Sequence, residues 1–369
     1  MTDNFDRDLF CIAGLPFDAI SLQGTVSHLQ SVMSNKENCF VSTPNLNFLI
    51  ACQSDKEFRE SVINSDLSIA DGMPIVWMAR LLGIPIAERV AGSSLFDELL
   101  NQDSDYKFSV FFFGGEEGVA EKACQQINLA GKAVCKGCIS PGFGNVEEMS
   151  RNDWIQQINE SNADFLVVAL GARKGQAWLE ANREKLTIPV YSHLGAVVNF
   201  VAGRVSRAPR WLQRSGLEWL WRIKEEPQLW VRYWKDGIGL LKLLITGVIP
   251  YAFWLKFNSA EKLSDGTLSE QKLIFIPGGD RQIIKLEGIF SIQNLSEPRR
   301  VFRDIAAKST DVSIDFEAVS YVDPAFIGLL LVLRKQLNYN GNKLRLINVN
   351  TKIKKLFGWN GVKFLLDHS

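Results

Sequence analysis

The sequence indicates an α/β protein in which a Rossmann-like parallel sheet carries a basic helical appendage and precedes a small second α/β domain. Short, fully apolar runs alternate with amphipathic stretches, a pattern typical of parallel strands that are covered on both faces. A polar stretch near residue 260 separates this pattern from a second, shorter one. The length of 369 residues also fits two domains better than one.

The strands of the first domain are short apolar runs, most of which end in Gly, Asn or Thr. They are predicted at Leu9–Ala13, Cys39–Ser42, Ser109–Phe113, Phe165–Leu170 and Pro189–Ser192. Helices are predicted between them, for example over Glu117–Leu129 and Arg151–Asn159. Ligands bind at the carboxyl ends of parallel strands, so the residues directly after each run are the first candidates for a site.

A basic, tryptophan-rich segment follows. Over the whole chain 41 Lys and Arg residues balance 41 Asp and Glu residues, which argues against a nucleic-acid binder. Between Gly203 and Phe257, however, there are ten basic and four acidic residues, so this segment carries +6 and the rest of the chain −6. Six of the ten tryptophans lie in the same segment. We therefore expect the function to centre on this segment.

The end of this segment is apolar enough to enter a membrane. Ile238–Phe257 contains only two charges, Lys242 and Lys256. At about 1.5 Å per residue, a helix of this length matches the thickness of a bilayer core. Pro250 lies inside the stretch, and a proline inside a helix kinks or ends it.

A second βα pattern begins after a polar linker. Its strands are predicted at Leu273–Pro277, Gln282–Leu286, Val312–Phe316 and Lys343–Ile347, and its helices at Pro298–Lys308, Ala325–Asn338 and Lys352–Phe357. The predicted organisation is residues 1–203 for the first domain, 204–257 for the appendage, 258–271 for the linker and 272–369 for the second domain.

All six cysteines lie in the first 138 residues. The N-terminus lacks the apolar core of a signal peptide, so we expect reduced, buried thiols. Cys135-Lys-Gly-Cys138 is a lone CxxC without a neighbouring His, and a zinc site needs four ligands. The cysteines therefore predict no metal site.

Asp71-Gly72 follows the run Asp66–Ala70 and opens a predicted helix, Met73–Leu82. A carboxylate at a strand end is well placed to accept a proton from a hydroxyl group. The same position also favours an aspartate that caps the helix. The residues alone leave both roles open.

Gly114-Gly115-Glu-Glu-Gly118 also joins a strand to a helix. Such glycines let backbone amides approach a diphosphate at a helix N-terminus. The run is neither GxGxxG nor a P-loop, so a plain strand-to-helix turn is the alternative.

Arginine and tryptophan alternate from Gly195 to Tyr233 at near-helical spacing. Guanidinium groups suit phosphates, and tryptophan suits a membrane interface. The plainer alternative is an amphipathic helix with core tryptophans and solvated arginines. Stacking on nucleic acid is disfavoured because a long apolar stretch follows directly.

Residues from about 10 to 235 resemble the WecG/TagA/CpsF family of glycosyltransferases. The matching blocks are Thr43-Pro-Asn45, Ala70-Asp-Gly72, Glu88-Arg-Val-Ala-Gly92, Gly114, Gly115, Gly118, Leu170-Gly171, Arg207-Ala-Pro209, Gly216-Leu-Glu-Trp219, Arg222, Glu226-Pro227 and Arg232-Tyr233. Their order and spacing over more than half of the chain carry the resemblance.

The resemblance implies an inverting transfer of a sugar from a UDP-sugar to a polyprenyl-diphosphate-linked saccharide in bacterial cell-surface or exopolysaccharide biosynthesis. It implies Asp71 as the general base, with Thr43 and Asn45 orienting sugar hydroxyls. The positions implied for donor binding are Gly72, Gly114, Gly115, Gly171, Gln176, Gly195 and Asn199. Those implied for the lipid diphosphate are Arg207, Arg222 and Arg232.

The chain departs from the family pattern near the expected donor pocket. Where the family reads Leu-Gly-x-Pro-Lys-Gln-Glu-x-Trp, residues 170–178 carry Arg173, Gly175 and Gln176, and the family's Phe-Asp is Val198-Asn199. We interpret these departures as a change of donor specificity.

No DxD pair follows a strand of the first domain, since the match at residues 103–105 lies in a polar loop. We therefore expect a metal-independent enzyme without cofactors, in which backbone amides and arginines neutralise the leaving UDP.

The final residues resemble a STAS domain, the anti-sigma-factor-antagonist fold. The resemblance rests on Ser313-Ile-Asp-Phe316, Tyr321-Val-Asp323, Gly328-Leu-Leu330, Gly341 and Leu344-Arg-Leu-Ile-Asn348. Phosphorylated members carry Ser or Thr two residues after the Asp, where this chain has Ala325. Because alanine cannot accept phosphate, we expect a constitutive module that docks a protein partner.

The expected location is the cytoplasmic face of the inner membrane, with a peripheral or re-entrant attachment. If Ile238–Phe257 spanned the bilayer, the two domains would lie on opposite sides, whereas nucleotide sugars and STAS partners are both expected in the cytosol. The alternative function is a non-catalytic scaffold that binds lipid-linked sugar and recruits partners through the STAS-like domain. A nicotinamide dehydrogenase is disfavoured because the glycine fingerprint is missing.

Overall fold

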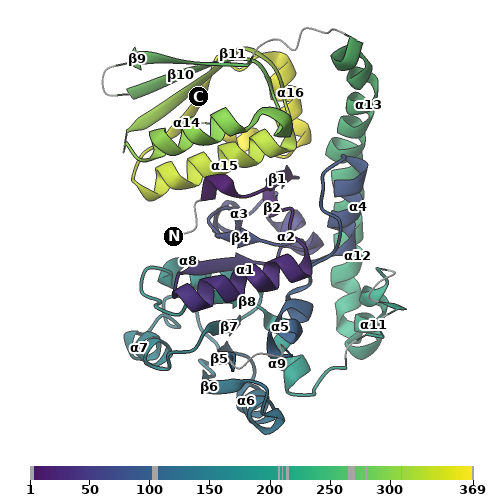
Figure 1. Ribbon diagram of the computed structural model, residues 1–369. Helices are drawn as coiled ribbons and strands as arrows, with labels where there is room; N and C mark the ends of the chain where they lie inside the picture. The colour runs from purple at the N-terminus through teal and green to yellow at the C-terminus, as the bar shows by residue number, and fades with distance from the viewer. Residues whose placement is uncertain are drawn as a thin grey trace. The chain divides into compact units, whose positions relative to one another are not determined.

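The computed structural model of the protein describes residues 4–101, 107–206, 208–209, 211–212, 216–264, 271–278, 281–308 and 310–367 (Figure 1). The chain forms two compact units. Among the described residues, unit 1 comprises 20–76 and 87–238, and unit 2 comprises 4–19, 77–86 and 239–367. Each unit is described by itself.

Unit 1 contains a six-stranded sheet in which all neighbouring strands are parallel. Its strands follow the order β4 (Leu67–Ser68), β3 (Cys39–Ser42), β8 (Val190–His193), β7 (Phe165–Ala169), β5 (Ser109–Gly114) and β6 (Val134–Ile139). This confirms the parallel α/β sheet predicted from the apolar runs.

Alternate side chains of each strand point to opposite sides of the sheet. In this sheet the side chains on both sides are apolar, so helices cover both faces. Val110 and Phe112 belong to one apolar core, and Phe111 and Phe113 belong to the other. The first core includes residues of α1 (Leu22–Asn35), α5 (Gly92–Leu100), α6 (Val119–Ala130) and α9 (Gly195–Val201). The second includes residues of α7 (Asn152–Glu160) and α8 (Ala172–Asn182), and α3 (Lys56–Ile63) packs on α8.

Predicted and observed strands agree closely in the centre of the sheet. β3 matches its prediction residue for residue, and β5, β7 and β8 agree to within one residue at each end. The edge strand β6 was missed. It contains the CxxC, and its side chains are only partly buried, so it lacks the continuous apolar run of a central strand.

The predicted strand Leu9–Ala13 is wrongly placed in the parallel sheet. β1 (Leu9–Ile12) pairs antiparallel with β2 (Leu15–Asp18) in a separate hairpin, and this hairpin belongs to unit 2. The turn has positive φ angles at Ala13 (49°) and Gly14 (90°). The units therefore differ from the predicted boundaries, which place residues 1–203 in a single domain.

Unit 2 is a small α/β domain, as predicted. Its sheet has the order β12 (Leu344–Ile347), β11 (Asp311–Val322), β10 (Arg281–Phe290) and β9 (Lys272–Gly278). β12, β11 and β10 are parallel, and β9 is antiparallel to β10. The helices are α14 (Ser296–Ala306), α15 (Pro324–Tyr339) and α16 (Thr351–Trp359).

The hairpin packs on α15. A Cβ atom at Gly328 would lie 2.6 Å from the Leu9 carbonyl oxygen, so only glycine lets the helix approach β1 this closely. Arg299 donates to Asp8 at 3.1 Å and Arg303 to Asp6 at 2.6 Å. The hairpin is therefore an integral part of unit 2.

One long helix runs from Pro227 to Asn258. It consists of the 3-10 turn η2 (Pro227–Leu229), α12 (Trp230–Leu243), a π-helical turn η3 (Leu244–Val248) and the start of α13 (Ile249–Ser264). Pro250 does not interrupt it, because the π turn directly before it shifts the hydrogen-bond pattern. α13 also occupies the first part of the predicted linker, whose residues 265–270 lie outside the described residues.

The remaining short elements are α2 (Leu46–Ala51), α4 (Met73–Leu81), α11 (Glu218–Glu225), and the 3-10 turns η1 (Asn4–Asp6), η4 (Ile292–Asn294) and η5 (Lys363–Leu365).

The cysteines are only partly free thiols. Cys11, Cys39 and Cys52 are buried thiols, as expected. Cys124 and Cys135, however, are joined in a disulfide between α6 and β6, which corrects the expectation for this pair. Their Cα atoms lie 5.1 Å apart, within the range that a disulfide spans.

Candidate active site

Three loops converge around Asp71 at the carboxyl edge of the unit 1 sheet. Asp71 donates its backbone N–H to the Pro44 carbonyl at 3.0 Å, which ties the loop after β4 to the loop after β3. Val90 donates to the Ala70 carbonyl at 2.9 Å and brings in the loop before α5. Asp71 is partly exposed at this junction.

The Asp71 carboxylate accepts a hydrogen bond from the backbone N–H of Gly92, the first residue of α5. Burial raises the pKa of Asp71, while the nearby guanidinium groups of Arg89 and Arg222 act in the opposite direction. The carboxyl group is thus more basic than an exposed aspartate and still lies beside two cations.

The two arginines share a third acidic partner. Arg89 Nη1 lies 2.5 Å from Glu218 Oε2, and Arg222 Nε lies 3.4 Å from Glu218 Oε1. Although burial acts to raise the pKa of Glu218, Arg89 and Arg222 hold it below its usual value. Arg222 also donates to the Tyr233 hydroxyl. Asp71, Arg89, Glu218, Arg222 and Tyr233 therefore form one electrostatic network.

Of this network, the sequence predicted Asp71 and Arg222 as site residues. Arg89, Glu218 and Tyr233 were missed, although all three lie inside the motif blocks that carried the resemblance. For Arg89 and Glu218, the signal that could have found them is a charged side chain in a short block that also contains glycine. Tyr233 directly follows Arg232, which was predicted as a site residue.

Thr43 and Asn45 follow β3 and lie next to this network. Thr43 is buried, and its methyl group is a close neighbour of Gly92. Asn45 Oδ1 accepts the Phe48 N–H at 3.2 Å and so caps α2. Gly72 lies beside Asn45. Both predicted polar residues are therefore at the same edge as Asp71, and Asn45 also has a structural role.

The glycines after β5 allow close packing against β7. A Cβ atom at Gly114, whose φ is 106°, would lie 2.6 Å from the Ala169 carbonyl oxygen. Gly115 donates to that same oxygen at 2.9 Å. Gly118 is the N-cap of α6. These glycines therefore form the strand-to-helix turn that joins β5 to α6. The turn lies at the edge of the sheet where a ligand would bind.

One departure from the family pattern, Gly175, is explained by its contact with a residue at the end of β8. A Cβ atom at Gly175 would lie only 2.2 Å from Cδ2 of His193, so the absence of a side chain at position 175 makes room for the histidine. Burial lowers the pKa of His193 to about 4. Its Nε2 is buried and has no partner among the described residues.

The other predicted donor positions are spread along the same edge. Gly171 is the N-cap of α8, Gly195 begins α9, and Asn199 is partly exposed on α9. Gln176 is buried and donates to Ser42 Oγ at 2.6 Å, so it supports β3 from within the core.

The appendage is tied to the rest of unit 1 at α2. Asn47 donates to Asp236 of α12 at 3.0 Å, and half-exposed Arg232 lies 3.8 Å from the same carboxylate. Arg207 and the Asp-Ser-Asp match at 103–105 lie outside the described residues.

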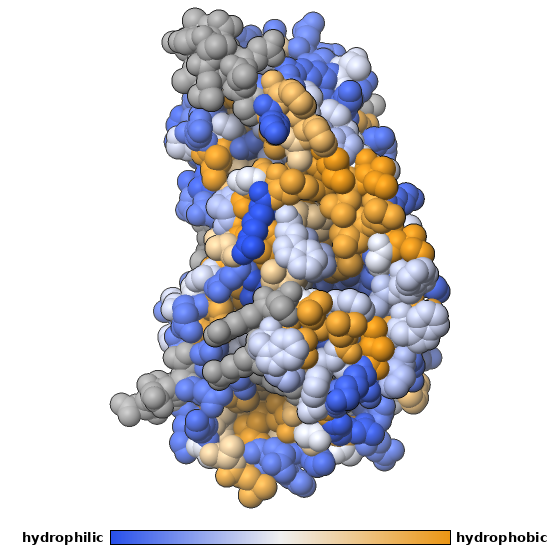
Figure 2. All heavy atoms as spheres, turned by 90° about the vertical axis from the view of Figure 1, so that its right-hand side faces the viewer, coloured by the Kyte–Doolittle hydropathy of each residue, from blue (hydrophilic) through white to orange (hydrophobic). Residues whose placement is uncertain are grey.

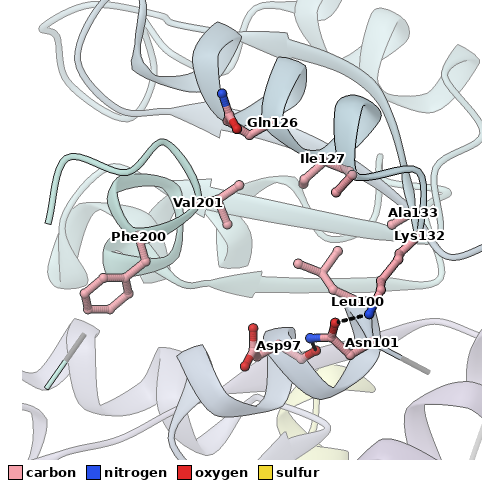
Figure 3. Close-up of a pocket in the computed structure, with 10 residues that line it drawn as sticks. Asp97, Leu100, Asn101, Gln126, Ile127, Lys132, Ala133, Phe200 and Val201 are labelled. Carbon is pink, nitrogen blue, oxygen red and sulfur yellow. Dashed lines mark hydrogen bonds between the residues drawn. The ribbon is translucent and has the colours of Figure 1, made fainter. Parts of the chain in front are cut away.

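A separate surface cavity of about 280 Å³ lies between α5, α6 and α9 (Figure 3). Asp97, Asn101, Gln126 and Lys132 provide its polar lining, and Lys132 donates to Asn101 at 3.0 Å. Residues 132 and 133 directly precede β6, so the cavity is at the amino ends of the strands, away from Asp71. Its link to the candidate site is Phe200, which lines the cavity and over whose ring Arg222 lies.

Comparison with known families identifies both parts of the chain. The model of the "Glycosyl transferase WecG/TagA/CpsF family" matches residues 10–250. The chain belongs to this glycosyl transferase family. The match spans the whole Asp71 network and confirms the predicted membership. The STAS domain model matches residues 278–366 and confirms the second domain.

Curated relatives of this glycosyl transferase include two Bacillus enzymes. Both are named N-acetylglucosaminyldiphosphoundecaprenol N-acetyl-beta-D-mannosaminyltransferase. The one from Bacillus spizizenii (strain ATCC 23059 / NRRL B-14472 / W23) is 26% identical over 59% of this chain and 84% of the relative. The one from Bacillus subtilis (strain 168) is 26% identical over 60% of this chain and 85% of the relative.

Among solved structures, the glycosyl transferase matches the Bacillus cell fate determinant SpoIIAA in its phosphorylated form with a TM-score of 0.23 and 18% identity, over 26% of this chain and 88% of that one. It also matches a GTP-binding protein from Sulfolobus solfataricus in complex with GDP, with a TM-score of 0.20 and 15% identity, over 71% of this chain and 89% of that one.

Proposed function

We propose that the protein transfers a sugar from a UDP-sugar to a polyprenyl-diphosphate-linked sugar with inversion at the anomeric carbon, and that Asp71 is the general base. The observation that carries the proposal is the Asp71 network: a carboxyl group with a raised pKa, at the carboxyl edge of a parallel sheet, beside two arginines. Family membership and the activity named for both Bacillus relatives support the reaction class.

The reaction needs one proton acceptor and one stabilised leaving group. The acceptor hydroxyl attacks the anomeric carbon while its proton passes to Asp71, and the bond from that carbon to the UDP oxygen breaks on the opposite face. Burial makes Asp71 a stronger base, while Arg89 and Arg222 act to lower its pKa and so favour the ionised carboxylate that accepts the proton. A single displacement of this kind inverts the anomeric centre.

Arg222 is the described residue best suited to bind a diphosphate. Its guanidinium is held by Glu218 and Tyr233 and lies over the ring of Phe200 at 5.8 Å. A guanidinium that is fixed before binding loses less conformational entropy when it binds phosphate oxygens. Arg207 and Arg232 are proposed as further contacts to the lipid diphosphate.

We propose that the transfer requires no metal and no cofactor. Support comes from the donors that converge on this edge, namely two arginines and the N-termini of α5, α8 and α9, which attract anionic groups. Adding EDTA to the assay should therefore leave turnover unchanged.

The proposed location is the cytoplasmic membrane face, with the long helix lying in the plane of the membrane. Pro227–Asn258 is long and apolar enough to cross a bilayer by length and composition. Inside unit 2, however, a Cβ atom at Gly247 would lie 2.7 Å from the Trp359 carbonyl oxygen, and Tyr251 is fully buried against the STAS-like domain. A spanning helix would carry these contacts, and the polar domain that makes them, to bilayer depth.

The decisive experiment compares the wild-type chain with Asp71→Asn. The chain is incubated with a panel of UDP-sugars and N-acetylglucosaminyl-diphosphate-polyprenol, and lipid products are identified by mass spectrometry. Loss of a general base is expected to lower kcat about 10²- to 10⁴-fold. For the wild type, the acid limb of kcat/KM should lie above the pH at which an ordinary aspartate ionises, because the pKa of Asp71 is raised.

Two controls show whether a loss of turnover comes from unfolding or from the removal of any carboxylate. A carboxyl group whose pKa is raised by folding makes the folded state less stable at neutral pH, so Asp71→Asn should show an unchanged or higher Tm. Asp153→Asn removes an exposed carboxylate on α7 that pairs with Arg151, and it should keep full turnover. Full turnover of Asp71→Asn would refute the base assignment, and a wild type inactive with every UDP-sugar would favour the non-catalytic scaffold.

A further inference from the structure

The STAS-like unit holds the end of the long helix through an aromatic cluster. The ring of Trp254 on α13 lies 5.4 Å from that of Tyr321 on β11 and 6.3 Å from that of Trp359 on α16. Tyr251 packs against Trp359 at 6.2 Å, and its hydroxyl lies 3.3 Å from that of Tyr321. α13 and α16 are therefore neighbouring parts of one packed surface in unit 2.

Apart from Glu261 near the end of α13, this pair of helices carries only positive charges. Residues 239–258 and 351–363 contain no Asp or Glu, and their six lysines are Lys242, Lys256, Lys352, Lys354, Lys355 and Lys363. Lys352 Nζ lies 5.7 Å above the ring of Trp254, and Lys355 Nζ lies 5.0 Å above that of Trp359. Both lysines are exposed, so their ammonium groups can also reach a ligand in solution.

A line of exposed apolar side chains runs along the same helix. Ile245, Ile249, Phe253 and Phe257 follow one another at four-residue spacing and therefore share one face. Their exposed fractions are 59%, 38%, 59% and 71%, whereas Tyr251 on the packed face is fully buried. Figure 2 shows the apolar side chains gathered along this helix.

We propose that the STAS-like unit itself binds the surface of an anionic phospholipid membrane. Lys352 and Lys355 contact lipid phosphates, the aromatic cluster lies at the headgroup level, and the line Ile245–Phe257 enters the acyl region. The inference rests on the proposed in-plane placement of the helix and extends it to α16, which lies outside the glycosyl transferase match.

A membrane fits these features better than a protein partner does. Lysine stems, tryptophan rings and a straight apolar line are the composition of interfacial helices, which bind by buried apolar area plus attraction to anionic lipid. The absence of any acidic residue in both sequence segments matches a uniformly negative surface, whereas a protein interface usually mixes both signs.

The test separates α16 from the basic appendage of unit 1. The full chain and the variant Lys352→Gln/Lys355→Gln are mixed with vesicles of pure phosphatidylcholine or of phosphatidylcholine with phosphatidylglycerol, and bound protein is measured by flotation. Each lysine near an anionic surface is worth a factor of about five in partitioning, so the double variant should bind phosphatidylglycerol vesicles about 30-fold more weakly. Binding to neutral vesicles should not change.

The matched control is Lys308→Gln/Lys343→Gln. These two exposed lysines belong to the same unit but lie before the amino ends of β11 and β12, whereas α16 begins after the carboxyl end of β12. The control should bind phosphatidylglycerol vesicles as the wild type does. Equal losses in the two double variants, or no loss in either, would overturn the proposal.

A second variant tests the apolar line. Phe253→Ser/Phe257→Ser should weaken binding to neutral and anionic vesicles alike, and unchanged binding would also overturn the proposal. Failure here is distinct from failure of the transferase proposal. Lys352→Gln/Lys355→Gln should retain turnover on detergent-dispersed acceptor, whereas Asp71→Asn should lose turnover and keep its vesicle binding.

Discussion

His193 occupies the space that a side chain at position 175 would need. The family pattern places a glutamine where this chain has Gly175, and any side chain there would collide with His193. A buried imidazole at the carboxyl end of β8 therefore lies at the edge where the donor is proposed to bind. Because the two positions are 18 residues apart in the chain, only the fold shows that they depend on each other.

The buried imidazole makes stability depend on pH. The pKa of His193 is lowered to about 4, so between pH 6.5 and pH 4 the unfolded chain binds a proton that the folded chain does not. Stability from this group is complete above pH 6.5 and falls as the pH drops, by about 3 kcal/mol at pH 4. Urea unfolding at pH 7, 5 and 4 measures this loss.

Two variants identify the histidine responsible. His193→Asn should show a smaller loss of stability between pH 7 and pH 4 than the wild type, because asparagine does not titrate. His28→Gln, in a partly exposed position on α1, should keep the wild-type loss. Identical pH profiles for His193→Asn and the wild type would show that the imidazole is not the cause.

At the scale of elements, the sequence predicts those strands whose position follows from a local pattern of apolar residues. Central strands are continuous apolar runs, and β3, β5, β7 and β8 were located to within one residue. β11 and β10 extend well beyond their predicted ends because polar residues such as Glu317 and Glu287 continue them. The hairpin β1–β2 was missed, although two apolar runs separated by Ala13-Gly14 are a hairpin signal.

The site could be predicted only in part. Asp71 and the glycine turns follow strand ends, so pattern alone places them at the carboxyl edge. The contact between Arg89 and Glu218 joins residues 129 positions apart, and neither residue has a local pattern that names its partner. Likewise, nothing in the local sequence of Cys124 and Cys135 shows that α6 and β6 lie close enough for a disulfide.

The close approach of α15 to β1 makes a prediction for one glycine. Gly328→Ala places a Cβ atom 2.6 Å from the Leu9 carbonyl, and the helix must shift away from the hairpin. We expect a loss of about 1 to 3 kcal/mol in the free energy of unfolding, together with faster amide exchange at residues 9–18. Urea unfolding and hydrogen exchange measure the two effects.

Gly237→Ala is the matched control for this change. Gly237 is also a helical glycine, but a Cβ atom there would meet nothing within 4 Å. Alanine is the better helix former, so this variant should be neutral or slightly more stable. If Gly328→Ala behaved in the same way, the close approach of α15 to β1 would be refuted.

At the scale of the whole molecule, the STAS-like domain is part of the structure that buries the N-terminal hairpin. Ala325, at the position where phosphorylated STAS domains carry Ser or Thr, is buried and borders a small cavity with Asn4, Arg7 and Leu9. The chain's own N-terminal segment thus covers this position. The expected docking of a protein partner through this domain stays a prediction, and it would have to use other surfaces.

Removal of residues 272–369 should therefore also leave the N-terminal hairpin without the helix on which it packs. The truncated chain exposes the apolar residues of β1 that pack on α15, and we expect it to aggregate or to bind a hydrophobic dye. Size-exclusion chromatography and dye fluorescence test this. By contrast, Asp6→Ala/Asp8→Ala removes only two exposed ion pairs with Arg303 and Arg299 and should change stability by less than about 1 kcal/mol. A monomeric truncated chain without dye binding would contradict the prediction.

The shared packing of residues 9–18 with α15 also sets an order of events during synthesis. The ribosome makes the hairpin first and its partner helix more than 300 residues later. At about 5 to 20 residues per second, the apolar strands β1 and β2 wait for at least 15 seconds without their final neighbours. Unit 1 can form its sheet in this interval, but unit 2 cannot close until translation has passed α15. A nascent chain that stalls earlier keeps an apolar hairpin exposed, which is the kind of surface that chaperones and proteases recognise.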